Sequence, residues 1–161
     1  MLAERDFNSV FGKISLSNGV LNTFSNAQVT SFKIYKKEKI LDIKLKLPDI
    51  INELIVDDFK NELFSQVPGV NDIIVSLTYC NDCTDTGLII KKAWDNIVRC
   101  VSAIGPVCRS IISSSKWEVE NNSLIIKVRN NMSFYMNAKK SDRLIENKLR
   151  NESGLDIRVM F

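Results

Sequence analysis

The chain has 161 residues, of which 45% are hydrophobic and 25% charged, with a formal net charge of +3 and no histidine. This composition is typical of a globular protein with one domain or two small ones. The lack of histidine removes the commonest general base and metal ligand, which disfavours catalysis without excluding it. Residues 1–80 carry 9 basic and 10 acidic side chains (net −1), and residues 81–161 carry 13 and 9 (net +4). The second half is therefore mildly basic, well short of a dedicated nucleic-acid binder.

The sequence predicts a protein of the cytoplasm without membrane contact. Its N-terminal residues are charged and lack the long apolar core of a secretory signal. No apolar run approaches the roughly 20 residues that a membrane helix needs. Without an export signal, we expect the four cysteines to be reduced thiols.

The first half predicts the order helix, strand, strand, helix, strand. The clearest signal is Leu41 to Leu47, where apolar residues alternate with aspartate and lysine until Pro48. In the preceding strand Phe32 and Ile34 share a face, and we expect Asp57 to cap the second helix. The five elements are expected at residues 17–25, 29–35, 41–47, 57–67 and 70–79.

The second half predicts the same order, with its first helix split. Gly105-Pro106 interrupts a helical apolar pattern, and Asn121-Asn122-Ser123 forms the turn of a hairpin. The helices are expected at residues 88–104, 107–114 and 133–151, and the strands at 117–120, 124–128 and 155–161. Each closing strand returns through a helix, which predicts mixed sheets.

These patterns predict an α+β fold of two tandem α-β-β-α-β modules, at residues 1–80 and 88–161, joined by a polar loop at residues 81–87. We expect each module to be a small three-stranded sheet covered by helices. The order is similar to that of KH-like modules, especially in the second module. However, the G-x-x-G loop that clamps nucleic-acid backbone in KH domains is absent.

No motif indicates a catalytic, cofactor or metal site. Cys80 and Cys83 form a C-x-x-C, but no second pair completes a zinc site, and Cys100 and Cys108 look like small core residues. Two sets of carboxylates could gather near a cation, although the ordinary role of such residues is as caps and turn residues: Asp72, Asp82 and Asp85, and Asp57 with Asp58. P-loop, dinucleotide-binding and nucleophile-elbow motifs are absent. We expect no catalytic residue, cofactor, metal or small-molecule ligand in this segment.

Two groups of residues are candidates for binding. The first is a possible docking site for a partner protein, although core packing is the usual role of such tryptophans: Trp94, Trp117, Lys91 and Arg99. The second gives weak DNA contact, although such lysines are usually a solvated face: Lys33, Lys37, Lys44 and Lys46. With Phe32 and Tyr35, these lysines form an alternative single-stranded nucleic-acid site.

Several stretches resemble known replication proteins. Residues 93–101 (A-W-D-N-I-V-R-C-V), 116–130 (K-W-E-V-E-N-N-S-L-I-I-K-V-R-N) and 155–161 (L-D-I-R-V-M-F) are similar to the N-terminal domain of the initiator DnaA. They are equally similar to the C-terminal domain of the clamp-loader tau subunit. Residues 32–48 (F-K-I-Y-K-K-E-K-I-L-D-I-K-L-K-L-P), with Phe7 and Phe11 before them, resemble the N-terminal region of PolC-type DNA polymerase III alpha subunits. The loop at residues 80–87 departs from this pattern.

The resemblance implies a non-catalytic region that docks a replicative polymerase to the replisome, with the tau subunit as partner. The parent protein would be a DNA-directed DNA polymerase with 3′–5′ exonuclease activity, and would use Mg²⁺ and other divalent metals. It would contact DNA through its other regions. A stand-alone interaction protein related to clamp loaders or initiators remains the alternative.

Overall fold

The computed structural model describes residues 5–80 and 85–161 of the chain. Within them lie seven helices and seven strands, in one four-stranded and one three-stranded sheet, so the fold is α+β. The chain forms two compact units, Met1–Asn81 and Asp82–Phe161. No helix in the described residues is long and apolar enough to cross a membrane.

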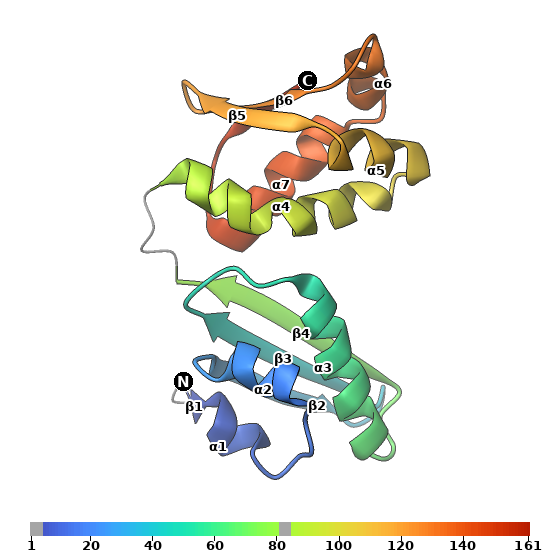
Figure 1. Ribbon diagram of the computed structural model, residues 1–161. Helices are drawn as coiled ribbons and strands as arrows, with labels where there is room; N and C mark the ends of the chain where they lie inside the picture. Colours follow the sequence, from blue (N-terminus) through green and yellow to red (C-terminus); the bar gives the residue numbers. More distant parts are fainter. Residues whose placement is uncertain (1–4, 81–84) are drawn as a thin grey trace. The chain divides into compact units, whose positions relative to one another are not determined.

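The first unit places helices on one face of a mixed sheet (Figure 1). Its strands lie in the order β1-β2-β3-β4, with β1–β2 and β2–β3 antiparallel and β3–β4 parallel. The elements are β1 (Arg5–Asp6), α1 (Phe7–Phe11), α2 (Asn18–Phe24), β2 (Gln28–Tyr35), β3 (Ile40–Leu47), α3 (Glu53–Gln66) and β4 (Asp72–Tyr79). The predicted mixed sheet is therefore confirmed.

The prediction of three strands in the first module was wrong, because β1 adds a fourth. β1 has only two residues, both charged and exposed, so no apolar alternation announces it. It forms because Phe7 and Phe11 directly after it are buried in the core. The backbone N–H of Phe7 donates to the carbonyl of Ala27 at 3.0 Å, which holds this segment beside the start of β2.

The start of α3 was also predicted wrongly. The helix begins at Glu53, and Asn52 is its cap, accepting a hydrogen bond from the Leu54 N–H at 3.0 Å. Asp57 lies inside the helix instead of capping it. Asparagine is as good a cap as aspartate, and the earlier cap lets Val56 join the buried face of the helix.

Four phenylalanine rings form the centre of the first unit. The ring of Phe59 on α3 lies 5.4 Å from Phe7, 5.3 Å from Phe11 and 5.3 Å from Phe24, measured between centroids. All four rings are at most 2% exposed. Aromatic pairs at these separations add to the stability from area burial. The cluster thus joins three helices above the sheet.

A β-bulge at Thr30 changes which residues of β2 face the helices. Val29 pairs with Leu45, but Ser31 pairs with Lys44, so Thr30 has no counterpart on β3. Before the bulge Val29 points to the helix face. After it Phe32 does, since Phe32 pairs with the buried Ile43.

The second unit has a three-stranded mixed sheet with the order β5-β6-β7 (Figure 1). β5 and β6 form an antiparallel hairpin, and β7 runs parallel to β6. The elements are α4 (Thr86–Ser102), α5 (Pro106–Ser113), β5 (Lys116–Glu120), β6 (Ser123–Lys127), α6 (Met132–Ala138), α7 (Ser141–Ser153) and β7 (Arg158–Met160). Buried residues from α4, α5, α7 and the inner face of the sheet form its core.

Two predictions for the end of the chain need correction. The single helix expected over residues 133–151 is two helices, because Lys140 adopts a left-handed conformation (φ 54°) that interrupts the helical backbone. Nothing in the residue pattern requires this break. The strand expected over residues 155–161 is reduced to β7, although Ile157 before it is also buried.

Candidate interaction surfaces

The two tryptophans of the chain contact each other in the second unit. Trp94 lies on α4, whose first turn is held by Asp85, and Trp117 lies on β5 opposite Ile126. Their ring centroids are 5.7 Å apart, with the ring planes at 32°. Both side chains are half-buried. The pair thus combines a packing role with a partly exposed surface.

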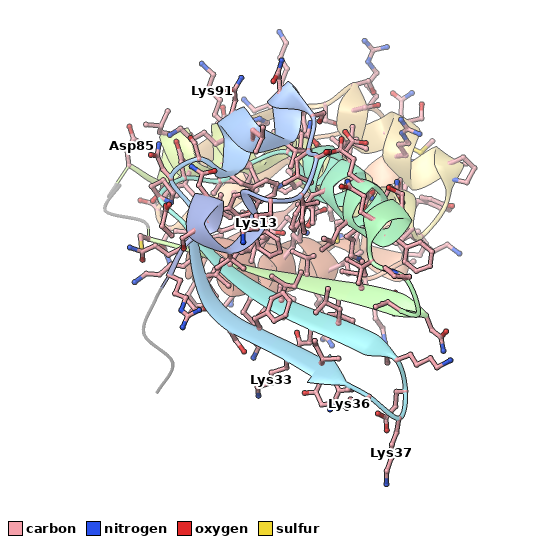
Figure 2. All side chains as sticks on the ribbon, turned by 90° about the horizontal axis from the view of Figure 1, so that it is seen from below. Lys13, Lys33, Lys36, Lys37, Asp85 and Lys91 are labelled. Atoms are coloured by element: carbon pink, nitrogen blue, oxygen red, sulfur yellow. The ribbon has the colours of Figure 1, made fainter. Side chains whose placement is uncertain are left out.

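The two basic residues predicted beside Trp94 are placed differently on α4. Lys91 precedes Trp94 by three residues, so it is a neighbour of Trp94 on the helix surface. It is exposed and projects from the helix (Figure 2). Arg99 follows by five residues, lies on another row of the helix and is half-buried. Helix geometry therefore supports Lys91, more than Arg99, as a companion of the Trp94–Trp117 pair.

Three of the four predicted DNA-contact lysines share one face of the first sheet. Lys44 and Lys46 alternate with buried residues on β3, and Lys33 pairs with Asp42 on the same outer face. Lys37 lies in the β2–β3 turn, and Figure 2 shows it and Lys33 projecting from this hairpin. No helix among the described residues of this unit packs on that face.

The aromatic residues expected beside these lysines do not lie together. Tyr35 pairs with Ile40 and shares the outer face with Lys33. Phe32 lies on the helix face, where its ring centroid is 6.1 Å from that of Phe11. Phe32 and Tyr35 are three residues apart in a regular part of β2, so strand alternation places them on opposite faces and splits the predicted nucleic-acid site between two faces of the sheet.

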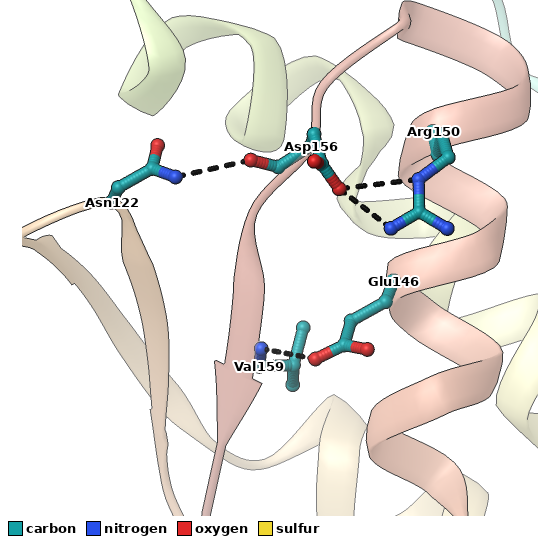
Figure 3. Close-up of polar contacts among 5 residues, drawn as sticks. All are labelled: Asn122, Glu146, Arg150, Asp156 and Val159. Atoms are coloured by element: carbon teal, nitrogen blue, oxygen red, sulfur yellow. Dashed lines mark hydrogen bonds and ion pairs between the residues drawn. The ribbon is translucent and has the colours of Figure 1, made fainter.

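A polar network in the second unit was not predicted. It joins α7, the β5–β6 turn and β7 (Figure 3). Arg150 on α7 donates to Asp156 Oδ1 from Nη2 at 2.5 Å and from Nε at 3.2 Å. The Asn122 side chain donates to the Asp156 carbonyl at 3.1 Å, and the Val159 N–H donates to Glu146 Oε1 at 2.9 Å. The side chains of this network line a cleft of about 440 Å³: Asn122, Glu146, Arg150 and Asp156.

The contacts of this network hold α7, the β5–β6 turn and the segment around β7 together. The hydrogen bond to Asp156, followed by its negative charge, raises the pKa of Arg150 above its usual value. Arg150 and Asp156 are both solvent-exposed, so their attraction is screened. The backbone contacts from Asn122 and Glu146 hold the chain on both sides of Ile157. The sequence signal for this arrangement was Asn121-Asn122, since asparagine readily adopts the positive φ seen at both positions.

The predicted metal-ligand candidates are dispersed where the structure describes them. Cys83 and Asp82 lie outside the described residues, and Cys80 is exposed. Asp85 caps α4 through a 3.1 Å hydrogen bond from the Leu88 N–H. Asp57 and Asp72 line one cleft of about 400 Å³ together with Lys60. Residues 5–80 and 85–161 contain no group of three or more possible metal ligands.

Large apolar side chains are exposed on α6 and on β2. Phe134 on α6 is 80% exposed. On β2, Phe32, Ile34 and Tyr35 are 38%, 61% and 44% exposed. Periodicity placed Phe32 and Ile34 on one face correctly, but it does not show that the helices stop short of the outer half of β2.

Fold and surfaces together define a class of protein: a tandem pair of small α+β units, each with helices on one face of a mixed sheet. Comparison with protein families gives the particular one. Residues 6–77 match the family described as DNA polymerase III polC-type N-terminus I, and residues 92–161 match DNA polymerase III polC-type N-terminus II. The chain therefore carries the N-terminal regions I and II of PolC-type DNA polymerase III. No curated protein and no solved structure gives a significant match.

Proposed function

We propose that these regions are a non-catalytic docking segment, which attaches a PolC-type replicative polymerase to the replisome in the cytoplasm. The observation that carries this proposal is the half-buried Trp94–Trp117 pair inside the match to N-terminus II. Tryptophans that are partly exposed and held by a rigid neighbour are typical anchors of protein interfaces. Polymerization and proofreading would reside in other regions of the parent polymerase.

The proposed partner is the clamp-loader tau subunit. The resemblance of residues 93–161 to the C-terminal domain of tau and the N-terminal domain of DnaA supports this partner, because both are protein-interaction modules. Lys91 next to Trp94 would speed the encounter with an acidic partner surface, since exposed charges at an interface rim act mainly on association. The stand-alone interaction protein remains the alternative to a segment of the polymerase.

Calorimetric titration of the 161-residue chain with the purified cognate tau subunit tests this proposal. Trp94→Ala should weaken binding by tenfold or more, as loss of an interface hot spot does. Phe64→Ala is the matched control, since Phe64 is a half-exposed aromatic residue on α3 of the other unit. Circular dichroism verifies the folding of both variants. Absence of binding to tau, or equal losses in both variants, would contradict the proposal.

A second candidate function is weak binding of single-stranded nucleic acid by the outer face of the first sheet. The observation that favours it is the common face of Lys33, Lys44, Lys46 and Tyr35. A fluorescence titration with an oligonucleotide at two salt concentrations tests it. Contact of three lysines with phosphates predicts a slope of about −2 for log K against log salt. Binding that does not depend on salt would argue against this candidate.

A further inference from the structure

Among residues 5–80, the outer edge of β2 is unpaired for most of its length. β1 pairs only with Gln28 and Val29. In the described part of the chain no strand pairs with residues Thr30 to Tyr35 of β2 on the side opposite β3. The edge therefore presents backbone N–H and C=O groups that an extended chain can pair with. Natural proteins usually shorten, cover or charge such an edge, and here the charge is of one dominant sign.

The groove beside this edge has apolar and polar walls. It measures about 450 Å³, and its lining comes from β1, α1 and β2: Arg5, Ser9, Val10, Val29, Thr30, Ser31 and Phe32. Phe32 and Ile34 extend its apolar side along the helix face and are exposed. Lys33 lies between them in sequence and points to the other face. A strand added here would thus meet apolar groups on one side and a lysine on the other.

The charge around the edge selects the occupant. Arg5, Lys33, Lys36 and Lys37 lie along it or in the adjoining turn, against Asp6 and Glu38. Figure 2 shows Lys33, Lys36 and Lys37 projecting outward from the hairpin. A second copy of this edge would bring the same positive charges together, which is unfavourable. Lys33 and Tyr35 share the outer face that is the candidate nucleic-acid surface, whereas the unpaired backbone groups of the edge match those of an extended polypeptide.

We propose that the edge of β2 from Thr30 to Tyr35 accepts an extended segment of a partner protein, in which apolar and acidic residues alternate. The segment would add a strand to the first sheet. Its apolar side chains would lie over Phe32 and Ile34, and its carboxylates would face Lys33 and the lysines of the turn. This surface belongs to the first unit and does not depend on the tryptophan site of the second.

Nuclear magnetic resonance titration of the full chain tests the proposal with two synthetic octapeptides, one alternating valine and glutamate and one alternating valine and lysine. The acidic peptide should shift the amide signals of Arg5 and of residues 30–35, and the basic peptide should shift none. Two further versions of the acidic peptide carry N-methyl groups on alternate amides, one on the odd-numbered and one on the even-numbered residues. Only one of the two phases of methylation should abolish binding, because alternate amides pair with the edge.

Two triple variants with the same change of charge complete the test. Lys33→Gln/Lys36→Gln/Lys37→Gln should weaken binding of the acidic peptide about tenfold. Lys44→Gln/Lys46→Gln/Lys60→Gln, which leaves the edge intact, should bind as the unchanged chain does. Equal binding of both peptides, no binding, or tolerance of N-methylation in both phases would overturn the proposal. If an oligothymidylate shifted the same amide signals and displaced the peptide, nucleic acid and not a peptide would be the ligand of this edge.

Discussion

The ring centroids of Trp94 and Trp117 lie 5.7 Å apart, and their contact connects the middle of α4 with β5, the first strand of the second sheet. Trp94 belongs to a helix whose other inward side chains are buried, whereas Trp117 belongs to a strand at the edge of the sheet. The contact therefore fixes the edge strand to the helical layer. At the same time it leaves part of both rings exposed.

The tryptophan contact should be energetically coupled. We expect Trp94→Ala and Trp117→Ala to destabilise the protein by less in combination than the sum of their separate effects. The difference should be about 0.5–1.5 kcal/mol, as for other aromatic pairs. Urea unfolding followed by circular dichroism measures it. Trp94→Ala with Met160→Ala is the control pair, because Met160 faces away from the core; its effects should add within about 0.5 kcal/mol.

Loss of the Phe59 ring should strongly destabilise the first unit. Phe59→Ala removes a fully buried side chain that contacts three other rings, and we expect a cost of about 3–5 kcal/mol. Phe64→Ala on the same helix should cost less than about 1 kcal/mol, since its side chain is 50% exposed. Thermal unfolding of both variants provides the comparison. Equal losses would show that the aromatic cluster is not the centre of the core.

The carboxylate of Glu146 should matter through the backbone of β7. Glu146→Ala leaves the part-buried Val159 N–H without its acceptor, at a cost of about 1–3 kcal/mol. Glu146→Gln keeps an oxygen acceptor and should retain most of the stability. Hydrogen exchange of the Val159 amide measures the effect locally. Equal protection of this amide in both variants would mean that the bond contributes little.

Relief of a strained backbone should stabilise the second unit. Lys140 has a φ of 54°, which costs a residue with a side chain about 1–2 kcal/mol, whereas glycine adopts it freely. We expect Lys140→Gly to raise the free energy of unfolding by about 0.5–1 kcal/mol. Lys139→Gly, at an ordinary φ of −84°, should lower it. The pair of neighbouring lysines thus supplies its own control in chemical denaturation.

The contribution of the Arg150–Asp156 ion pair to stability should not change with pH near neutrality, because Arg150 keeps its charge there. The pKa of Arg150 is raised in the folded state, so its contribution is complete below the unfolded pKa and is lost only as pH rises through the folded one. Between about pH 6 and pH 10 the destabilisation by Arg150→Gln should therefore be constant. High salt should reduce it. A destabilisation that varies across this range would contradict the assignment.

Periodic segments were the most predictable part of the fold. The alternation in β3 and β4 indicated which side chains face the core, and Leu41, Ile43, Leu45 and Ile73 are buried as expected. The strand β1 and the break at Lys140 were not predictable in this way. Both depend on tertiary packing and on single backbone conformations, which leave no repeating pattern in the sequence.

For the candidate sites, too, the sequence predicted only which residues of one helix or strand lie together. Helical spacing placed Lys91 near Trp94, and strand alternation placed Lys44 and Lys46 on one face. The contact between Trp94 and Trp117 joins residues from distant segments, and no local pattern contains it. The network around Asp156 is equally non-local, although Asn121 and Asn122 were recognizable as turn residues.

The single extra residue in β2 has a wider consequence. Because side chains alternate along a strand, one unpaired residue exchanges inside and outside for everything beyond it. If Thr30 instead paired with Lys44, so that β2 ran on from Val29 without a bulge, Phe32 would pair with Asp42 on the outer face and Lys33 with Leu41 on the side of Phe11. The apolar and the cationic sides of the hairpin tip would then be interchanged. Which side of this polymerase segment attracts which ligand therefore depends on whether Thr30 bulges out of the ladder or pairs with β3.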